Sequence, residues 1–290
     1  MTAGGATRAD AVDIVLPTFR RPHTIGFAIR SVLGQTHRHF TLHVVGDGCS
    51  AETEEVVRSF DDPRLRFRRF PKATGFGYVH RNVVLRESAA PYVAYMTDDD
   101  LWFPDHLERG LQVLGRGEAG LVAFRSVQVR HPDLLDPYFF AFDWRLGPPS
   151  RWLRNWFMGS VNCVHRRDVF EQVGYWNDHL FRFGDREFYN RVRTSSVVTR
   201  YLDRVTVLRF YAQHWDGRYD GLPAPPQGLY LERIQDPAWR ESVHQALAGG
   251  RGFAVRRRQA ADFFAFAVRS GPKFARFWYQ KLRSPKPAYA

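Results

Sequence analysis

The sequence predicts an α/β protein with a mainly parallel sheet flanked by helices, followed by a basic C-terminal extension. Two observations predict this architecture. Short apolar runs rich in Val and Ile alternate with segments in which apolar residues recur at helical spacing. Ten Lys or Arg residues against one Asp then occupy residues 251–290, in a chain whose net charge is +12. Strands that alternate with helices pair in parallel, and helices then cover both faces of the sheet.

The first half of the chain begins with a strand over residues 12–19 (VDIVLPTF), which is closed by a Pro. Apolar residues then recur at helical spacing from Ile25 to Leu33. Residues 41–48 (TLHVVGDG) predict a second strand that ends in Gly and Asp. The elements that follow are a helix over 52–60, an edge strand over 64–70, a helix over 81–90 and a strand over 91–96.

The second half continues with a helix marked by Leu107, Leu111 and Leu114 and with a strand over 120–129. A loop rich in Pro and aromatic residues follows over 131–156. The remaining predictions are a strand, helix and turn within 155–176, a helix over 183–192, and one or two strands within 197–211.

The predicted domain organisation has three parts. Residues 1–10 form a flexible N-terminus, residues 11–220 form the main domain, and residues 221–290 form a linker and a basic amphipathic extension. The Pro- and Gly-rich stretch GLPAPPQG, which begins at residue 221, marks the edge of the main domain. No apolar run approaches the ~20 residues that span a bilayer, and no leader is recognisable, so we expect a cytoplasmic protein. The two cysteines, Cys49 and Cys163, lack the spacing of a zinc site and are expected to be buried thiols.

Several polar residues fall at the carboxyl ends of the predicted strands. Phe19, Asp47 and the run Asp98, Asp99 and Asp100 all occupy such ends. In open α/β sheets, ligands bind at the carboxyl ends of the strands, so these residues are expected to converge on one crevice. Three adjacent carboxylates repel one another unless a cation neutralises them, although a solvated turn also tolerates such a cluster.

Several motifs, in this order, resemble the family 2 glycosyltransferases, which have the Rossmann-like GT-A fold. They are DIVLPTFRRP, VVGDGCSAET, HRNVVLRESAAPYVAY, TDDDLWFPDHLE and VGYWNDHLFRFGDREFYNRV. The likeness runs from Asp13 to His214, and the loop over 131–156 is its least similar part. The resemblance implies an inverting enzyme that transfers a sugar from a UDP- or dTDP-sugar to an acceptor hydroxyl.

The resemblance implies a donor nucleotide site formed by the end of the first strand, the end of the second and the helix over 81–90. In the family, an aspartate at the position of Asp47 accepts the imide N–H of a pyrimidine base, and Gly46 replaces the Asp that usually precedes it. The alternative for Asp47 is a turn-forming residue, and for Arg81 a solvated helix residue. The donor-site residues implied are Pro17, Thr18, Phe19, Asp47, Arg81 and Asp98.

The resemblance also implies a divalent cation, Mn²⁺ or Mg²⁺, bridging the donor phosphates. Asp99 aligns with the family's metal ligand, with Asp100 behind it and Asp98 facing the ribose or a metal-bound water. Thr97 stands where many members carry an Asp, so the choice among the three aspartates stays open. His214 resembles a histidine that completes the metal or diphosphate site, and the alternative is a histidine packed in the core.

An inverting transfer needs a base that takes the proton from the attacking hydroxyl. Asp185 matches that residue, although Gly184 replaces the Glu that usually precedes it, and the alternative is a helix N-cap. Glu187 falls on the second acid of the motif and is expected to support the loop. Trp102 is an acceptor-side candidate because an indole can stack on a sugar face.

Three other classes compete with the transferase. A sugar nucleotidyltransferase shares the sheet and the metal, but LPTFRRPH lacks the glycines of a phosphate loop. A non-catalytic nucleotide-sugar-binding module would not need an acid at position 185. The third is a nucleic-acid binder recruited through the basic extension, but the main body is only mildly basic, so no nucleic-acid partner is expected. Residues 251–290 mix basic and bulky apolar residues, which favours contact with an anionic membrane or packing on the domain. The acceptor is not indicated by the sequence.

Overall fold

The computed structural model describes residues 9–131, 134–137, 159–210 and 224–249. Their elements, in chain order, are β1 (Val12–Thr18), α1 (Ile25–Leu33), β2 (Phe40–Asp47), α2 (Ala51–Arg58), β3 (Leu65–Phe70), α3 (Tyr78–Glu87), β4 (Tyr92–Tyr95), β5 (Leu101–Trp102), α4 (His106–Leu114), β6 (Leu121–His131), β7 (Leu134–Pro137), the 3₁₀ turn η2 (Ser160–Asn162), β8 (Cys163–Arg166), α6 (Val169–Val173), α7 (Gly184–Thr194), β9 (Thr199–Phe210), α9 (Gln227–Arg233) and α10 (Pro237–Gly249).

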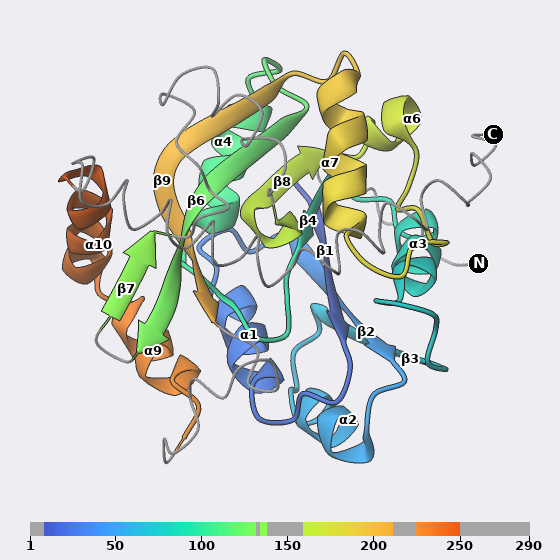
Figure 1. The fold of residues 1–290 in the computed structure, drawn as a ribbon, viewed down its shortest axis with the longest axis horizontal. Helices are drawn as coiled ribbons and strands as arrows, with labels where there is room; N and C mark the ends of the chain where they lie inside the picture. The colour runs from blue at the N-terminus through green and yellow to red at the C-terminus, as the bar shows by residue number, and fades with distance from the viewer. Residues whose placement is uncertain (1–8, 132–133, 138–158, 211–223, 250–290) are drawn as a thin grey trace, which may run out of the picture. The chain divides into compact units, whose positions relative to one another are not determined.

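One sheet runs through the structure in the order β3-β2-β1-β4-β8-β6-β9-β5, with β7 paired to β6 (Figure 1). The β1–β2, β1–β4 and β2–β3 pairs are all parallel. This confirms the predicted α/β class and the edge position of β3. The far half is mixed, because β8 runs antiparallel to both β4 and β6, while β6 and β9 are parallel.

Helices cover both faces of the sheet because the central strands are apolar on both sides. Ile14 and Leu16 of β1 belong to one hydrophobic core, together with Ile25 and Ile29 of α1. Val15 of β1 points to a second core. The second core also contains residues of α3, α6 and α7, namely Val84, Leu85, Val169, Phe170, Phe188 and Val192. A strand buried on both faces reads as a continuous apolar run, which is how β1 was recognisable.

The sequence-based boundaries differ from the structure in several places. β9 is a single strand of twelve residues, in line with the one or two expected, but the short strand β5 was not expected and β7 lies within the segment expected to be a loop over 131–156. The chain divides into compact units over residues 1–241 and 242–290. Helix α9 therefore belongs with the sheet, beyond the limit at residue 220 that the Pro- and Gly-rich stretch suggested.

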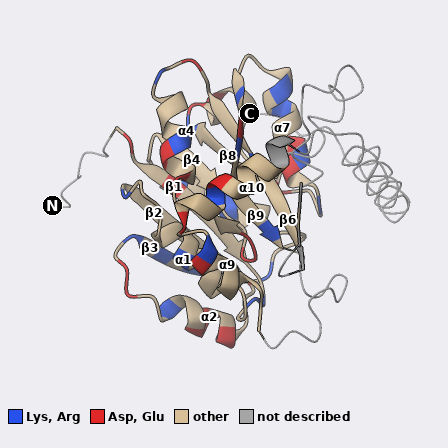
Figure 2. Cartoon of the chain, turned by 90° about the vertical axis from the view of Figure 1, so that its left-hand side faces the viewer, with Lys and Arg blue, Asp and Glu red and all other residues tan. Residues whose placement is uncertain are grey.

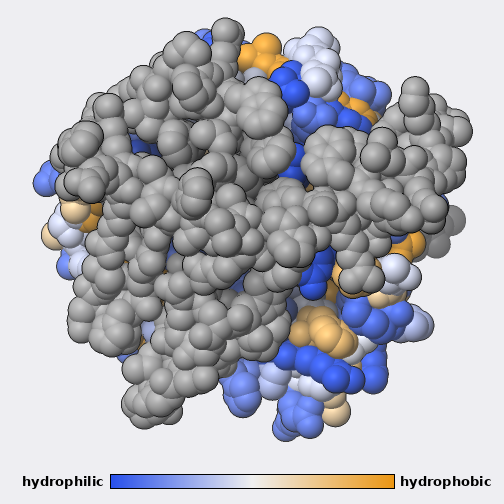
Figure 3. Space-filling model, in the orientation of Figure 1, coloured by the Kyte–Doolittle hydropathy of each residue, from blue (hydrophilic) through white to orange (hydrophobic). Residues whose placement is uncertain are grey.

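Acidic residues lie along α2 (Figure 2), where Glu52 and Glu54 occupy the first turn. The described residues visible on the face in Figure 3 are mainly hydrophilic, with smaller hydrophobic areas between them. Among the described helices, none combines the length and the apolar character needed to cross a membrane. The basic extension over 251–290 lies outside the described residues, so its contact with a membrane stays a prediction.

Candidate functional site

The three adjacent aspartates lie in the turn between β4 and β5, beside the end of β1. The backbone N–H of Phe19 donates to Asp98 Oδ2 at 3.4 Å. The Arg21 guanidinium lies 3.8 Å from Asp98 Oδ1 and 4.0 Å from Asp99 Oδ2. The parallel pairing of β1 with β4 thus brings the two strand ends together, as the sequence predicted.

The three aspartates have different environments. Asp100 is fully buried, and it accepts hydrogen bonds from Thr97 Oγ1 at 2.6 Å and from the Phe210 N–H at 3.0 Å. The Arg209 Nε lies 3.2 Å from Asp100 Oδ2. The side chains of Asp98 and Asp99 keep 14% and 18% of their surface exposed. Asp100 therefore ties the turn to the end of β9, while Asp98 and Asp99 are the two that a ligand can reach.

The electrostatics of the turn suit a divalent cation. Desolvation and the negative charges of Asp100 and Asp98 raise the pKa of Asp99 well above its usual value. Desolvation also raises the pKa of Asp98, against the opposing effect of the Arg21 charge. Carboxylate oxygens are the ligands of Mg²⁺, Mn²⁺ and Ca²⁺, and a cation at this point would favour both ionised forms. Asp98 and Asp99 are thus the residues that fit such an ion, and the role of Asp100 as a ligand stays a prediction.

Helix α9 supports the aspartate turn from the other side. The buried Gln227, in the first turn of α9, donates from Nε2 to the Asp99 carbonyl at 3.1 Å. Sequence reasoning missed Gln227 because it placed the edge of the domain before this helix.

Asp185 lies in the first turn of α7, but it is not the helix N-cap. The N-cap is Phe183, whose backbone is left-handed with φ 63°. Asp185 Oδ2 instead accepts hydrogen bonds from the N–H and the Oγ of Ser160, at 2.9 and 3.0 Å. Among the described residues, none donates a hydrogen bond to Asp185 Oδ1. The carboxylate is therefore fixed through one oxygen while the other is left for a further partner.

The glycine before Asp185 is explained by packing. A Cβ at Gly184 would lie 2.4 Å from Cε1 of Tyr78, closer than carbon atoms approach one another. The Gly184 N–H also donates to the Tyr78 hydroxyl at 2.9 Å. The Glu that the family usually carries here would collide with the Tyr78 ring.

One short segment, residues 159–162, lies between Asp185 and the aspartate turn. Ser160 holds Asp185, as described above, and the Val161 carbonyl accepts a hydrogen bond from Trp102 Nε1 at 2.9 Å. Trp102 directly follows the aspartates in β5. Arg209, the arginine that contacts Asp100, leaves no room for a side chain at position 159, because a Cβ atom there would lie 2.6 Å from Arg209 Nη1.

Trp102 is not an acceptor-side residue, which corrects the sequence-based assignment. The side chain is fully buried, and its ring stacks on His106 with centroids 4.3 Å apart. A ring enclosed in the core cannot stack on a sugar. The exposed aromatic residues near Asp185 are Phe76 and Phe181, at 43% and 52% exposure, with the Arg182 guanidinium 5.8 and 5.6 Å from their ring centroids.

The loops that carry this exposed pair meet at Gly75. Its φ is +68°, and a Cβ there would lie 2.5 Å from the Phe181 carbonyl oxygen, so the close approach requires a glycine. We name Phe76, Phe181 and Arg182 the aromatic rim. The sequence offered little signal for it, because isolated Phe residues in loops are common.

Asp47 and Arg81 lie near each other at the end of β2 and the start of α3. Asp47 is buried, and it accepts a hydrogen bond from Lys72 Nζ at 2.5 Å and one from the Ala73 N–H at 2.7 Å. Arg81 is only 8% exposed, with Nη2 donating to the Phe76 carbonyl at 3.0 Å. The interpretation of Arg81 as a solvated helix residue is therefore wrong. Its Nε has no hydrogen-bond partner within the described part of the chain.

The remaining predicted site residues have varied placements. Pro17 and Thr18 end β1 beside Phe19, as expected. Glu187 pairs with Arg191, with 2.9 Å between Oε1 and Nε, and Arg191 also donates to the Tyr175 carbonyl at 2.7 Å. Glu187 therefore supports the loop before α7, and its side chain is committed to that contact. His214 lies outside the described residues, so its role stays a prediction.

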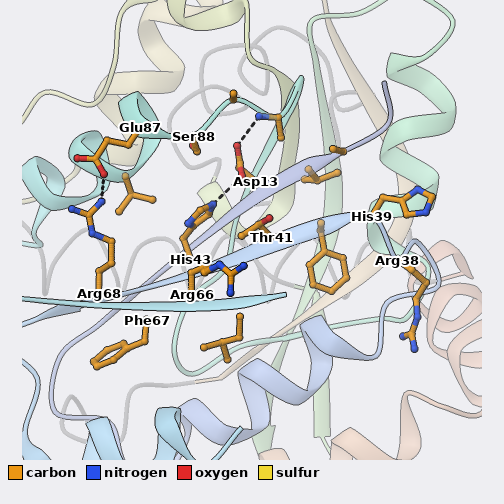
Figure 4. A pocket seen from close by; sticks show the side chains of 17 residues that line it. Asp13, Arg38, His39, Thr41, His43, Arg66, Phe67, Arg68, Glu87 and Ser88 are labelled. Carbon is orange, nitrogen blue, oxygen red and sulfur yellow. Dashed lines mark hydrogen bonds and ion pairs between the residues drawn. The ribbon is translucent and has the colours of Figure 1, made fainter. Parts of the chain in front are cut away.

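A cavity of about 770 Å³ lies toward the amino ends of the parallel strands, away from the aspartate turn (Figure 4). It is lined by the amino ends of β1, β2 and β3 and by the end of α3, including Asp13, His43 and Arg66. The strands of this half are parallel, so the cavity is a full strand length away from Asp98 and Asp99. It is separate from the predicted donor site.

Solved structures identify the class of fold. TarS of S. aureus (residues 1–349) in complex with UDP-GlcNAc superposes with a TM-score of 0.59 at 14% identity, covering 77% of this chain and 65% of that one. The mannosyltransferase PcManGT from Pyrobaculum calidifontis, in complex with GDP-Man and Mn²⁺, gives a TM-score of 0.52 at 17% identity, covering 92% and 82%. The fold is that of the GT-A glycosyltransferases.

The family follows from the sequence match. The model of the glycosyl transferase family 2 matches residues 13–174, which confirms the resemblance, and the chain belongs to this family. The UDP-Glc:alpha-D-GlcNAc-diphosphoundecaprenol beta-1,3-glucosyltransferase WfgD of Escherichia coli is 31% identical over 103 residues, covering 36% of this chain and 40% of WfgD. Protein CgeD of Bacillus subtilis is 24% identical over 204 residues, covering 63% and 46%. The chain thus spans less than half of the length of these two relatives.

Proposed function

We propose that the protein is an inverting glycosyltransferase that uses a UDP- or dTDP-sugar and a divalent cation, Mn²⁺ or Mg²⁺, to glycosylate an acceptor hydroxyl. The observation that carries the proposal is that residues 159–162 contact both Asp185 and the residue that follows the aspartate turn. Ser160 holds Asp185, and the Val161 carbonyl accepts a hydrogen bond from Trp102, two residues after Asp100. A donor site and a base on one rigid support are what a direct displacement needs.

On the donor side, Asp98 and Asp99 are the proposed ligands of the cation. A divalent cation bound there would offset the diphosphate charge that grows as the glycosidic bond breaks. Arg21 lies within 4 Å of both carboxylates, so its guanidinium is positioned beside the proposed cation and the donor phosphates. Asp47 and Arg81 are proposed to bind the nucleotide. Asp47 would give up the hydrogen bond from Lys72 or from the Ala73 N–H and accept one from the N–H of the base instead.

On the acceptor side, Asp185 is the proposed general base. Its Oδ2 is held by Ser160, and Oδ1 takes the proton from the attacking hydroxyl. The oxygen of that hydroxyl forms the new bond to the sugar carbon as the bond from that carbon to the donor diphosphate breaks, and UDP or dTDP leaves. In the aromatic rim, Phe181 and Arg182 precede Asp185 by a few residues, and the side chains of Phe76 and Phe181 are exposed. We propose that it replaces Trp102 as the surface that contacts the acceptor.

The decisive experiment is a panel of UDP-, dTDP- and GDP-sugars tested for thermal stabilisation of the protein, with and without Mn²⁺ or Mg²⁺. Ligand binding to the folded state raises the melting temperature by mass action. We expect stabilisation by a UDP- or dTDP-sugar that depends on the cation and is lost in Asp99→Asn. Stabilisation by GDP-sugars alone would contradict the pyrimidine assignment.

The same panel separates the competing classes when product release is measured. A transferase releases UDP or dTDP from the donor once an acceptor or water is available. A binding module shows stabilisation without release. A nucleotidyltransferase makes the sugar nucleotide from a sugar phosphate and a nucleoside triphosphate, with release of pyrophosphate.

A further inference from the structure

Three metal-ligating side chains meet away from the donor site. Asp10, His37 and His39 each place one ligand atom so that the three atoms lie within 4.8 Å of one another. Asp10 precedes β1 and the histidines precede β2, so the cluster lies at the amino edge of the sheet. His39 stands at the start of β2 beside Arg38 in Figure 4.

The backbone holds the cluster together through strand pairing. The Val12 N–H donates to the His39 carbonyl at 3.0 Å, and Val12 is in register with Phe40. The His37 ring donates from Nε2 to the same His39 carbonyl at 3.1 Å. The spacing between Asp10 and the two histidines is therefore fixed by the β1–β2 ladder, before any ion binds.

The side chains of the cluster are accessible and suitably oriented. His39 Nδ1 lies 2.9 Å from Asp10 Oδ2, and both side chains are exposed. Arg38 lies between the two histidines in sequence, but its guanidinium donates to the Leu33 carbonyl at 3.0 Å and not to the cluster.

We propose that Asp10, His37 and His39 bind a divalent ion of the zinc class, with solvent in the remaining coordination position. Two imidazoles and one carboxylate suit Zn²⁺, Ni²⁺, Co²⁺ or Cu²⁺, whereas the all-carboxylate aspartate turn suits Mg²⁺ or Mn²⁺. A bound ion would link the segment before β1 to the segment before β2. The two proposed sites therefore prefer different metals and lie at opposite ends of the parallel strands, one before β1 and β2 and the other after β4.

The test uses the full chain without a histidine tag, stripped of metal and kept in Mg²⁺ so that the aspartate turn does not take up the probe. Titration calorimetry with Zn²⁺ alone is expected to show a site that His37→Ala and His39→Ala each weaken by at least about tenfold, because each removes a ligand. Asp99→Asn and His179→Ala are matched controls, since His179 is an exposed histidine outside the cluster. Both controls should bind Zn²⁺ like the parent.

Melting curves in chelator check that the histidine variants fold as the parent does, and Asp10→Asn provides an independent variant of the third ligand. A rise in melting temperature with Zn²⁺ in the parent and in His179→Ala, but not in His39→Ala, supports the site. Zn²⁺ affinity that is the same in the parent, His37→Ala and His39→Ala overturns it.

Discussion

At the scale of single residues, the most informative substitution is Asp185→Asn. The change is nearly isosteric, and the Asn carbonyl oxygen can still accept the hydrogen bonds of Ser160, so the fold should be retained. The proton acceptor is lost, and we expect transfer to fall by ~10²- to 10⁴-fold, the usual contribution of a general base. Donor affinity, measured by metal-dependent binding of the nucleotide-sugar, should stay close to that of the parent.

A matched control for this prediction is Glu187→Gln, which removes the other acid of the same helical turn. Because Glu187 is paired with Arg191, we expect a small loss of stability and nearly unchanged chemistry. The opposite pattern, with parental transfer in Asp185→Asn and a large loss in Glu187→Gln, would move the base to Glu187.

The residue scale also shows where sequence reasoning fails. The aspartate run and Asp185 could be found because local motifs carry them. The burial of Trp102 and Arg81 could not, because it depends on distant partners. Trp102 is buried where β5 pairs with β9, and its partner there, Val207, lies far along the chain. The Arg81 guanidinium lies 5.8 Å from the centroid of the Trp176 ring, which is also distant in sequence.

At the scale of secondary structure elements, helix α9 is the part that the sequence did not assign to the site. Gln227→Leu keeps the size of the side chain but removes the hydrogen bond to the Asp99 carbonyl. One such bond is worth about 0.5–1.5 kcal/mol, so we expect metal-dependent donor binding to weaken a few-fold, up to about tenfold. Gln235→Leu, an exposed position just after the same helix, should leave it unchanged. Equal donor affinity in both variants, measured by calorimetry, would exclude a role for α9.

The elements themselves were largely predictable. Apart from the two-residue strand β5, the strands and helices up to β6 lie within a few residues of the expected ranges, because alternating apolar runs and helical spacing are local signals. The antiparallel insertion of β8 between β4 and β6 has no such signal, since strand order depends on packing across the whole sheet. Which of the three aspartates stay accessible likewise follows only from distant contacts, because Thr97 and Arg209 hold Asp100 in the interior.

At the scale of the whole molecule, two buried histidines make stability depend on pH. Burial lowers the pKa of His106 to about 3 and that of His165 to about 4. His165 is held neutral between the Tyr95 hydroxyl, which donates to Nε2 at 3.0 Å, and the Arg166 carbonyl, which accepts from Nδ1 at 2.7 Å. An unfolded histidine titrates near 6.5, so below that pH the unfolded chain takes up protons that the folded chain does not.

The free energy of unfolding should therefore fall as the pH drops from about 6.5 toward the folded pKa values. Between pH 7 and pH 5 each histidine contributes a loss of about 2 kcal/mol. His106→Gln keeps an atom that can bond Thr206, and it should reduce the loss by roughly that amount in urea unfolding at the two pH values. His179→Gln, at an exposed position, should show the full loss. An unchanged pH dependence in His106→Gln would contradict the assignment.

The contact of Tyr78 with Gly184 also restricts how this chain can change. A side chain at position 184 needs the space that the Tyr78 ring occupies, so the acid pair usual in the family cannot be restored by one substitution. Shrinking Tyr78 first would create a cavity and remove the acceptor of the Gly184 N–H, while adding Glu at 184 first would produce a collision. Either order passes through a weakened intermediate. The two positions are therefore expected to be exchanged together, and an engineered return to the usual motif should be attempted as a double variant.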